Sequence, residues 1–166
     1  MAFRATTLTY LAGMSTTPAR DNSIHRVERP ADDRMPNDPA LGEYLRNLEI
    51  KFQWKRTLRR LRELPTGWDS YDAPPPNDVS LAVADKFLDL LSNERLFPAS
   101  IIASAEGGIG ICFGASDRYA DLEFLNSGEI IGVRYRGTTL PIVWETDSSE
   151  GALIKSIKGI REYLEA

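Results

Sequence analysis

The chain has 166 residues, 42% of them apolar and 27% charged, and its formal net charge at pH 7 is −4. These values are typical of soluble globular proteins and leave room for one domain with a tail. No stretch approaches the ~18 consecutive apolar residues of a membrane-spanning helix. With one cysteine and one histidine, the sequence excludes internal disulfides, cysteine-rich metal sites and most histidine-dependent catalysis, so we expect no metal or other cofactor.

The first forty residues differ in character from the rest. Five arginines balance five acidic residues, and little apolar periodicity is found between Ser15 and Ala40. Four prolines interrupt any helix in this segment: Pro18, Pro30, Pro36 and Pro39. Such a segment cannot bury enough apolar surface to offset its ordering entropy. Residues 1–40 are therefore predicted to form a flexible tail.

The segment Met1–Met14 carries one arginine and a mildly apolar run, which gives it a superficial likeness to a signal peptide. Three threonines dilute that run, and no small-residue cleavage site follows it. No signal peptide is expected, and an alternative start at Met14 would give an ordinary amino terminus. We predict a cytoplasmic location, where a lone free cysteine is unremarkable.

From Leu41 onward the sequence predicts a folded domain that begins with a long helix. Apolar residues recur at helical spacing on one face and then on a rotated face. The first stripe is Leu41, Tyr44, Leu45, Leu48 and Phe52, and the second is Trp54, Leu58 and Leu61. We expect one helix of about twenty residues, buried on two sides or bent near Lys51, that ends at Pro65-Thr66-Gly67.

A second helix is predicted from Asn77 or Asp78 to Glu94, with Asn77 as its N-cap. Its inward stripe consists of Val83, Phe87, Leu90 and Leu91. After Pro98 the apolar period becomes two, which is typical of strands. The predicted strands are Ile101–Ala105, Ile109–Phe113, Tyr119–Leu125, Glu129–Tyr135 and Thr139–Trp144.

The turns between these strands are short, so neighbouring strands must be antiparallel. A last helix follows, with Leu153, Ile157, Ile160 and Leu164 as its apolar stripe. The predicted fold class is α+β, with an antiparallel meander of four to five strands packed on one face by two N-terminal helices and a C-terminal helix. We expect a single domain at 41–166, made of a helical part (41–97), a sheet (98–146) and a helix (147–166).

The segment Leu64–Pro76 (LPTGWDSYDAPPP) joins the two predicted helices and is the most unusual part of the sequence. Three prolines stiffen its outgoing end, and Gly67 permits a tight turn before Trp68. In a structural interpretation, Trp68 fills the helix junction and Asp69 accepts backbone hydrogen bonds. In a functional interpretation the segment is a rigid loop that binds a partner. Its contact residues would be Trp68, Asp69, Tyr71 and Asp72.

The stretch LPTGWDSYDAPPPN, the helix after it and the Gly-Gly turn in EGGIGICF resemble a family of small bacterial proteins. Members of that family share a Leu-Pro-x-Gly-Trp-Asp-Gly/Ser motif. The resemblance extends from Leu58 to Val133 and implies an α+β domain, and it carries over no catalytic residues. Ser70 stands where the common pattern has a second glycine.

Basic residues concentrate in the first predicted helix. Residues 41–65 contain seven basic and three acidic side chains, a net charge of +4, whereas residues 66–100 and 101–147 each carry −4. Four of the basic residues could bind nucleic-acid phosphates: Lys55, Arg56, Arg59 and Arg60. The other interpretation is that this face is solvated or pairs with acids of its own fold, such as Asp85 and Asp89.

Two acidic residues, Asp121 and Glu123, lie two apart on a predicted strand and therefore project from one face. Paired carboxylates can hold a metal or divide acid and base work. A metal-nuclease pattern would need a lysine where Leu125 stands, so an exposed strand face is the preferred interpretation. Cys112 lacks a nearby histidine as a base, and we expect it to be a small buried filler.

These observations favour a non-enzymatic bacterial protein that binds another protein, since the chain lacks a catalytic inventory and its tail and aromatic-acidic loop suit a partner. An antitoxin, an immunity factor or a subunit of a defence assembly would fit, with the partner encoded by a neighbouring gene. The alternative is a nucleic-acid-binding accessory protein that uses the basic helix 51–62. A carboxylate enzyme would need Asp69, Asp72, Asp121, Glu123 or Glu145 to converge in a cleft. No membrane association is expected.

Overall fold

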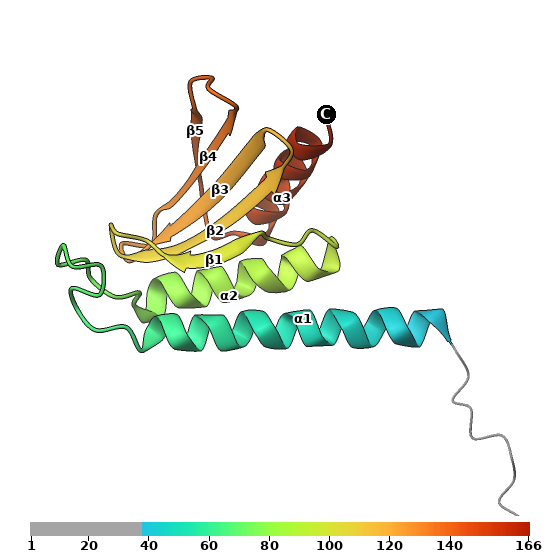
Figure 1. The fold of residues 1–166 in the computed structure, drawn as a ribbon, viewed down its shortest axis with the longest axis horizontal. Coiled ribbons are helices and arrows are strands. Elements are labelled where there is room, and N and C mark those ends of the chain that lie inside the picture. Colours follow the sequence, from blue (N-terminus) through green and yellow to red (C-terminus); the bar gives the residue numbers. More distant parts are fainter. Residues whose placement is uncertain (1–37) are drawn as a thin grey trace, which may run out of the picture. The chain divides into compact units, whose positions relative to one another are not determined.

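The computed structural model describes residues 38–166, and this part of the chain forms three helices and five strands (Figure 1). In chain order they are α1 (Pro39–Arg62), α2 (Asp78–Asn93), β1 (Ser100–Ala103), β2 (Gly108–Ala115), β3 (Arg118–Leu125), β4 (Ile130–Arg136), β5 (Ile142–Thr146) and α3 (Glu150–Glu165). The predictions for Met1–Met14, and for the tail up to residue 37, fall outside the described residues. Among residues 38–166, no helix combines the length and apolar character that crossing a bilayer requires.

The five strands pair in sequence order, and each is antiparallel to the next. Alternate residues of the two central strands are buried beneath the helices: Ile109, Ile111 and Phe113 of β2, and Ala120, Leu122 and Phe124 of β3. Side chains of a strand alternate between its two faces, so these six positions make one apolar face. The predicted α+β fold, an antiparallel meander with its helices on one face, is confirmed.

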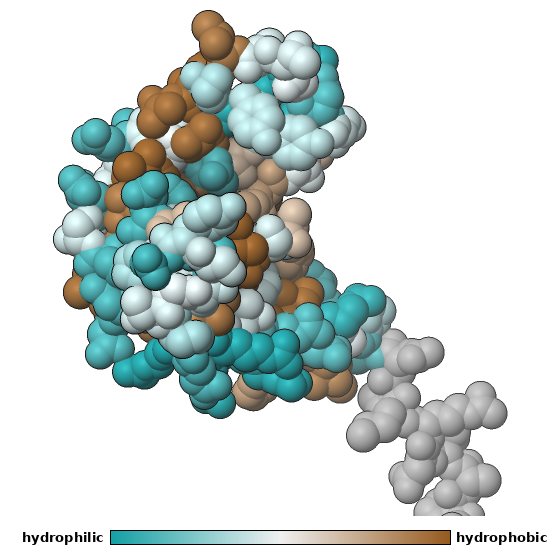
Figure 2. All heavy atoms as spheres, turned by 60° about the vertical axis from the view of Figure 1, so that its left-hand side comes forward, coloured by the Kyte–Doolittle hydropathy of each residue, from teal (hydrophilic) through white to brown (hydrophobic). Residues whose placement is uncertain are grey.

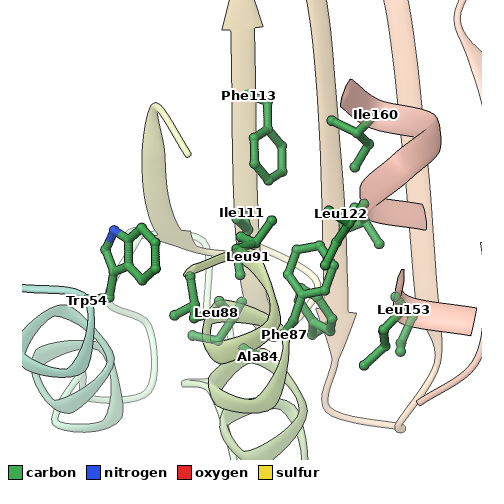
Figure 3. Packing of buried hydrophobic residues seen from close by; sticks show 14 of the residues in the cluster. Trp54, Ala84, Phe87, Leu88, Leu91, Ile111, Phe113, Leu122, Leu153 and Ile160 are labelled. Atoms are coloured by element: carbon green, nitrogen blue, oxygen red, sulfur yellow. The ribbon is translucent and has the colours of Figure 1, made fainter. Parts of the chain in front are cut away.

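Helices α2 and α3 supply the other half of the core. The buried side chains are Ala84, Phe87, Leu88 and Leu91 of α2, and Leu153, Ile157 and Ile160 of α3. Figure 3 shows Phe87 and Leu91 between Trp54 of α1 and Leu122 of β3. The ring centroids of Phe87 and Phe124 are 5.2 Å apart in a tilted arrangement, which is favourable for aromatic pairs. The predicted inward residues Val83, Leu90 and Leu164 lie partly buried at the margins of this core.

Helix α1 begins two residues earlier than predicted, and only one of its two predicted apolar stripes is buried. It begins at Pro39 rather than Leu41, with the Asp38 carboxylate capping it. Proline in the first turn removes no helical hydrogen bond, so Pro39 starts the helix instead of breaking it. Its buried residues are Trp54 and Leu58 of the second predicted stripe, and it packs on α2 and the edge strand β1.

The first predicted stripe of α1 is not buried. Its residues Leu41, Tyr44, Leu45 and Phe52 are exposed, and Leu48 is half-buried. Figure 1 shows α1 as one straight helix that extends past the end of α2. The exposure of the stripe places it on a side of α1 that no described element covers. The expectation of burial on two sides, or of a bend, is therefore corrected.

Hydrogen bonds from Asn126, in the turn between β3 and β4, join the helices to the sheet. The Asn126 side-chain oxygen accepts from the Asn77 backbone N–H (2.8 Å) and the Ser80 hydroxyl (2.9 Å). Its amide nitrogen donates to the Pro75 carbonyl (2.9 Å). Asn77 is the N-cap of α2, as predicted. One asparagine thus holds the proline segment and the first turn of α2 against the sheet.

Replacement of Asn126 tests this role. Asn126→Ala should lower the free energy of unfolding by about 2–3 kcal/mol, since it removes three hydrogen bonds of about 1 kcal/mol each. Urea denaturation followed by circular dichroism measures the change. Gln53→Ala, at an exposed site of α1, is the control and should stay within about 0.5 kcal/mol of the wild type. Equal effects of the two changes would contradict the role given to Asn126.

Candidate binding surfaces

The loop between α1 and α2 is held by one of its own carboxylates. The Asp69 carboxylate accepts hydrogen bonds from the backbone N–H groups of Tyr71 (2.9 Å) and Ala73 (3.1 Å). The bond from Tyr71, and then that from Ala73, lowers the pKa of the Asp69 carboxyl. Ala73 itself is buried. This carboxylate therefore has the structural role that the sequence offered as its first interpretation.

The four predicted partner-binding residues divide into two pairs. Trp68 is half-buried, and its indole nitrogen is buried without a hydrogen-bond partner among the described residues. Asp69 is engaged by the loop backbone. Tyr71 is 89% exposed, and Asp72 is exposed beside it. Of the four, Tyr71 is the aromatic side chain that a partner could reach directly, and its role in binding stays a prediction.

The backbone of this loop enters the left-handed region three times, at Gly67 (φ 74°), Ser70 (φ 68°) and Asp72 (φ 64°). Glycine adopts this conformation at no steric cost, whereas a residue with a side chain loses about 1–2 kcal/mol. Ser70 stands where the resembling pattern has glycine. Ser70 is therefore strained, and a glycine at this position would relieve the strain.

The two segments that carry the family resemblance contact each other. Gly107, in the Gly-Gly turn, lies so close to the proline segment that an added Cβ would be 2.7 Å from Pro74 Cγ and 2.8 Å from Asn126 Nδ2. The Gly107 carbonyl also accepts a hydrogen bond from the Asn126 backbone N–H (3.0 Å). This part of the motif therefore packs the helix pair against the turns of the sheet.

The basic side of α1 is partly neutralised by α2. The Lys55 ammonium contacts the carboxylates of Asp85 and Asp89, and the distance to Asp89 is 3.4 Å. Burial, the largest single influence, lowers the pKa of Lys55, but the two carboxylates together raise it above its usual value. Arg62 pairs with Asp78 at 2.7 Å. For these two residues, the structure agrees with the interpretation that basic residues of α1 pair with acids of the same fold.

The other predicted phosphate-binding residues remain available. Arg56, Arg59 and Arg60 are exposed, and none forms an ion pair with a residue in the part of the chain that the structure describes. The spacing 52, 56, 59 places Phe52, Arg56 and Arg59 on one face of the helix. This face continues the exposed apolar stripe toward the C-terminal half of α1.

We call this continuous surface the outer strip of α1. It consists of Leu41, Leu45, Leu48, Phe52, Arg56 and Arg59. The spacing is that of a single helical face, apolar in its first half and cationic in its second. Figure 2 shows brown atoms near the N-terminal end of α1 and teal atoms along its remainder.

The outer face of the sheet, away from the helices, is largely apolar, and Asp121 and Glu123 are half-buried on it rather than exposed as expected. Its apolar residues are Ile102, Tyr119, Ile131, Val133, Tyr135 and Val143, and the rings of Tyr119 and Tyr135 stack with centroids 5.2 Å apart. Asp121 and Glu123 project from the middle of this face. Burial, and then the charge of Glu123, raises the pKa of the Asp121 carboxyl. Cys112, expected to be buried, is half-buried on the same face.

The candidate carboxylates do not form a metal site. Within residues 38–166, no three histidine, cysteine or acidic side chains gather closely enough to hold an ion. Asp121, Glu123 and Glu145 share the outer face of the sheet by strand alternation. Asp69 and Asp72 instead belong to the loop between α1 and α2. Glu123 accepts a hydrogen bond from the Ser104 hydroxyl (2.7 Å), which gives it a structural partner.

A further group of residues was not singled out from the sequence. Arg134, Trp144 and Lys155 line a cavity of about 490 Å³ between α3 and the strands β4 and β5. Strand alternation could have predicted the position of Arg134. Arg134 and the buried Ile130 are four residues apart on β4, so both face the helices.

Comparisons of the chain with models of protein families, with curated proteins and with solved structures found no match. The resemblance to small bacterial proteins accordingly remains a prediction, and the function has to be inferred from the surfaces of the chain itself.

The strain at Ser70 leads to a prediction about stability. Ser70→Gly should raise the free energy of unfolding by about 0.5 kcal/mol, because relief of the left-handed strain (about 1–2 kcal/mol) exceeds the added entropy of the unfolded chain (about 0.4–1 kcal/mol). Urea denaturation measures the difference. Thr66→Gly, in the same loop but without a positive φ, should lower stability instead. A loss of stability in both variants would show that Ser70 is not strained.

The half-buried Asp121 leads to a prediction about pH. Its folded-state pKa is raised, so the wild-type protein loses stability as the pH rises from the unfolded value through the folded one. Asp121→Asn removes this titration and should make the protein more stable at neutral pH, with the gain vanishing at acidic pH where Asp121 is protonated in both states. Thermal melts of the two proteins between pH 3 and pH 8 measure the trend. A gain that persists unchanged at acidic pH would contradict the burial of this charge.

Proposed function

We propose that this protein acts by binding another protein, and that the outer strip of α1 is the contact surface. The observation that carries the proposal is the exposed apolar half of that strip, in which Leu45 is 55% and Phe52 is 69% exposed. Single exposed apolar residues are ordinary in soluble proteins. Here the exposed Leu41, Leu45 and Phe52 and the half-buried Leu48 follow the spacing i, i+4, i+7, i+11 and form instead the contiguous face with which a helix packs on a partner.

The cationic half of the strip indicates the chemistry of the partner. Arg56 and Arg59 continue the apolar face, and Arg60 lies beside it. A complementary surface would present apolar side chains next to aspartates or glutamates, since opposite charges across an interface fix its register and speed association. The strip from Leu41 to Arg59 is about 27 Å long, which is enough for one helix or groove of a partner.

A protein suits this surface better than a nucleic acid does. Phosphate binding would use cations spread along the helix, but here Lys55 and Arg62 are already paired and the N-terminal half of the strip is apolar. The alternative of a nucleic-acid-binding accessory protein is supported by Arg56, Arg59 and Arg60, which are exposed and form no ion pair within residues 38–166. Antitoxins, immunity factors and subunits of defence assemblies belong to the class of protein that we propose.

The proposal is tested by placing a photo-reactive amino acid at position 45 of the full chain, in the cells that naturally produce it. We expect cross-links to a protein that is acidic at the attachment site. The same group at Lys158, an exposed position of α3, is the control and should give no such adduct.

Substitution of the strip then measures the interaction with the captured protein. Phe52→Glu and Arg59→Glu should each weaken binding by about tenfold or more, as for residues that anchor an interface. Their melting temperatures should stay near that of the wild type because both side chains are exposed. Lys158→Glu is the control for the charge change in Arg59→Glu and should bind normally.

Three outcomes would contradict the proposal. The first is unchanged binding by Phe52→Glu, and the second is a cross-link from position 45 to another copy of this chain. The third is binding to nucleic acid that falls steeply with salt and is lost when Arg56, Arg59 and Arg60 are replaced, which would establish the alternative function.

A further inference from the structure

The cavity between α3 and the β4–β5 hairpin has the size of a small-molecule site. Its volume is about 490 Å³, within the range of about 300–1,000 Å³ that ligand pockets occupy. One wall is the face of α3 that carries Lys155, Ser156 and Gly159, and the other is formed by Arg134, Ile142 and Trp144. None of these residues belongs to the outer strip of α1.

The strand wall is a fixed apolar surface. Trp144 is paired in register with Gly132, and an added Cβ on Gly132 would lie 2.1 Å from the indole Cε2. The indole therefore rests directly on the glycine backbone, which holds it in place. Ile142, two residues away on the same face of β5, is 55% exposed although it faces the helix side. The cavity thus offers a planar aromatic group and an aliphatic group to a ligand.

The cationic group of this cavity lacks an anion. The Arg134 guanidinium carbon lies 5.2 Å from the centroid of the Tyr163 ring, which positions it by a cation–π contact. Its Nε–H is buried and has no hydrogen-bond partner among residues 38–166. The guanidinium also forms no ion pair with a carboxylate among these residues, so an anion at its terminal N–H groups would give it a charged partner. Lys155, exposed at the mouth, likewise pairs with no carboxylate of the described chain.

The two acidic residues of the lining, Glu145 and Asp147, form no ion pair with Arg134 or Lys155. The Asp147 carboxylate accepts a hydrogen bond from the Ser149 backbone N–H (2.7 Å), at the start of α3. Glu145 lies between Trp144 and Thr146 on β5, so its side chain belongs to the opposite face of the sheet. Arg134 and Lys155 therefore keep charges that no carboxylate of the described residues pairs with.

We propose that this cavity binds a small organic anion, in which a planar apolar body carries one carboxylate. The guanidinium fork of Arg134 matches a carboxylate geometrically, and Lys155 adds a second charge at the entrance. The planar body would lie against Trp144 and Ile142. A polyphosphate would bring more negative charge than one guanidinium and one exposed ammonium can balance, so the anion carries a single charge.

The test uses 2-naphthoate as the probe, its neutral analogue 2-naphthamide, and inorganic phosphate, each titrated into the full chain. The chain has three tryptophans, whose indole N–H signals are separate reporters in a ¹⁵N–¹H correlation spectrum. Trp144→Phe assigns the signal of Trp144. We expect 2-naphthoate to shift the Trp144 signal and leave those of Trp54 and Trp68 in place. The amide should bind about tenfold more weakly, because it lacks the charge-assisted hydrogen bond.

Matched variants identify the cations that carry the selectivity. Arg134→Met should abolish the preference for 2-naphthoate over 2-naphthamide, and Lys155→Met should reduce it several-fold. Lys158→Met, an exposed lysine on the same helix, is the control and should change nothing. If Arg134→Met does not fold, the exposed Lys155→Met replaces it. An unchanged preference for 2-naphthoate over 2-naphthamide in that variant would then contradict the proposal.

The result that would overturn the proposal is equal binding of 2-naphthoate and 2-naphthamide, or no shift of the Trp144 signal with 2-naphthoate. A response to inorganic phosphate alone would overturn the ligand class, since it would mark a phosphate site without an apolar partner.

Discussion

Helices α2 and α3 pack on the middle of the covered face of the sheet, and this arrangement accounts for both of the exposed features proposed as binding sites. Helix α2 packs on β2 and β3, and α3 packs on β2, β3 and β5. Helix α1 is left with α2 and the edge strand β1 (Figure 1). Its outer strip consequently meets no described element. Because α3 lies mainly over the centre of the sheet, the helix side of β4 and β5 is also incompletely covered, and the cavity forms there.

The fold could be predicted because it depends on local patterns. Periods of 3.6 and 2 separate helices from strands, and short turns force an antiparallel meander. Those patterns report which residues share a face, but not whether a neighbour covers it. The stripe from Leu41 to Phe52 has the same spacing whether it is buried or exposed, so its exposure depends on where the other elements pack and not on the helix sequence. Pro39 starts the helix instead of breaking it for a related reason, since the effect of a proline depends on where the helix begins.

Less of the candidate sites than of the fold could be predicted from the sequence. The role of Asp69 follows from the turn chemistry of aspartate, and the pairing of Lys55 with Asp85 and Asp89 follows from two helices of opposite charge. The cavity requires the pairing register of β4 and β5, because only that register places Trp144 on Gly132. Strand alternation places Arg134 on the helix side of the sheet, but it does not show whether a hydrogen-bond acceptor lies near its side chain. Long-range register is the information that local patterns lack.

The two proposed surfaces differ in how they affect folding. Side chains of the outer strip are accessible in both the folded and the unfolded chain, so their exposure costs little stability and a partner can cover them later. Arg134 differs from its neighbours, since Arg118 donates to the Tyr163 carbonyl, and Arg136 and Arg161 pair with carboxylates. Its guanidinium, by contrast, forms no ion pair with any carboxylate of residues 38–166. An anion bound in the cavity would therefore stabilise the fold, whereas a partner on α1 would gain its affinity mainly from apolar burial.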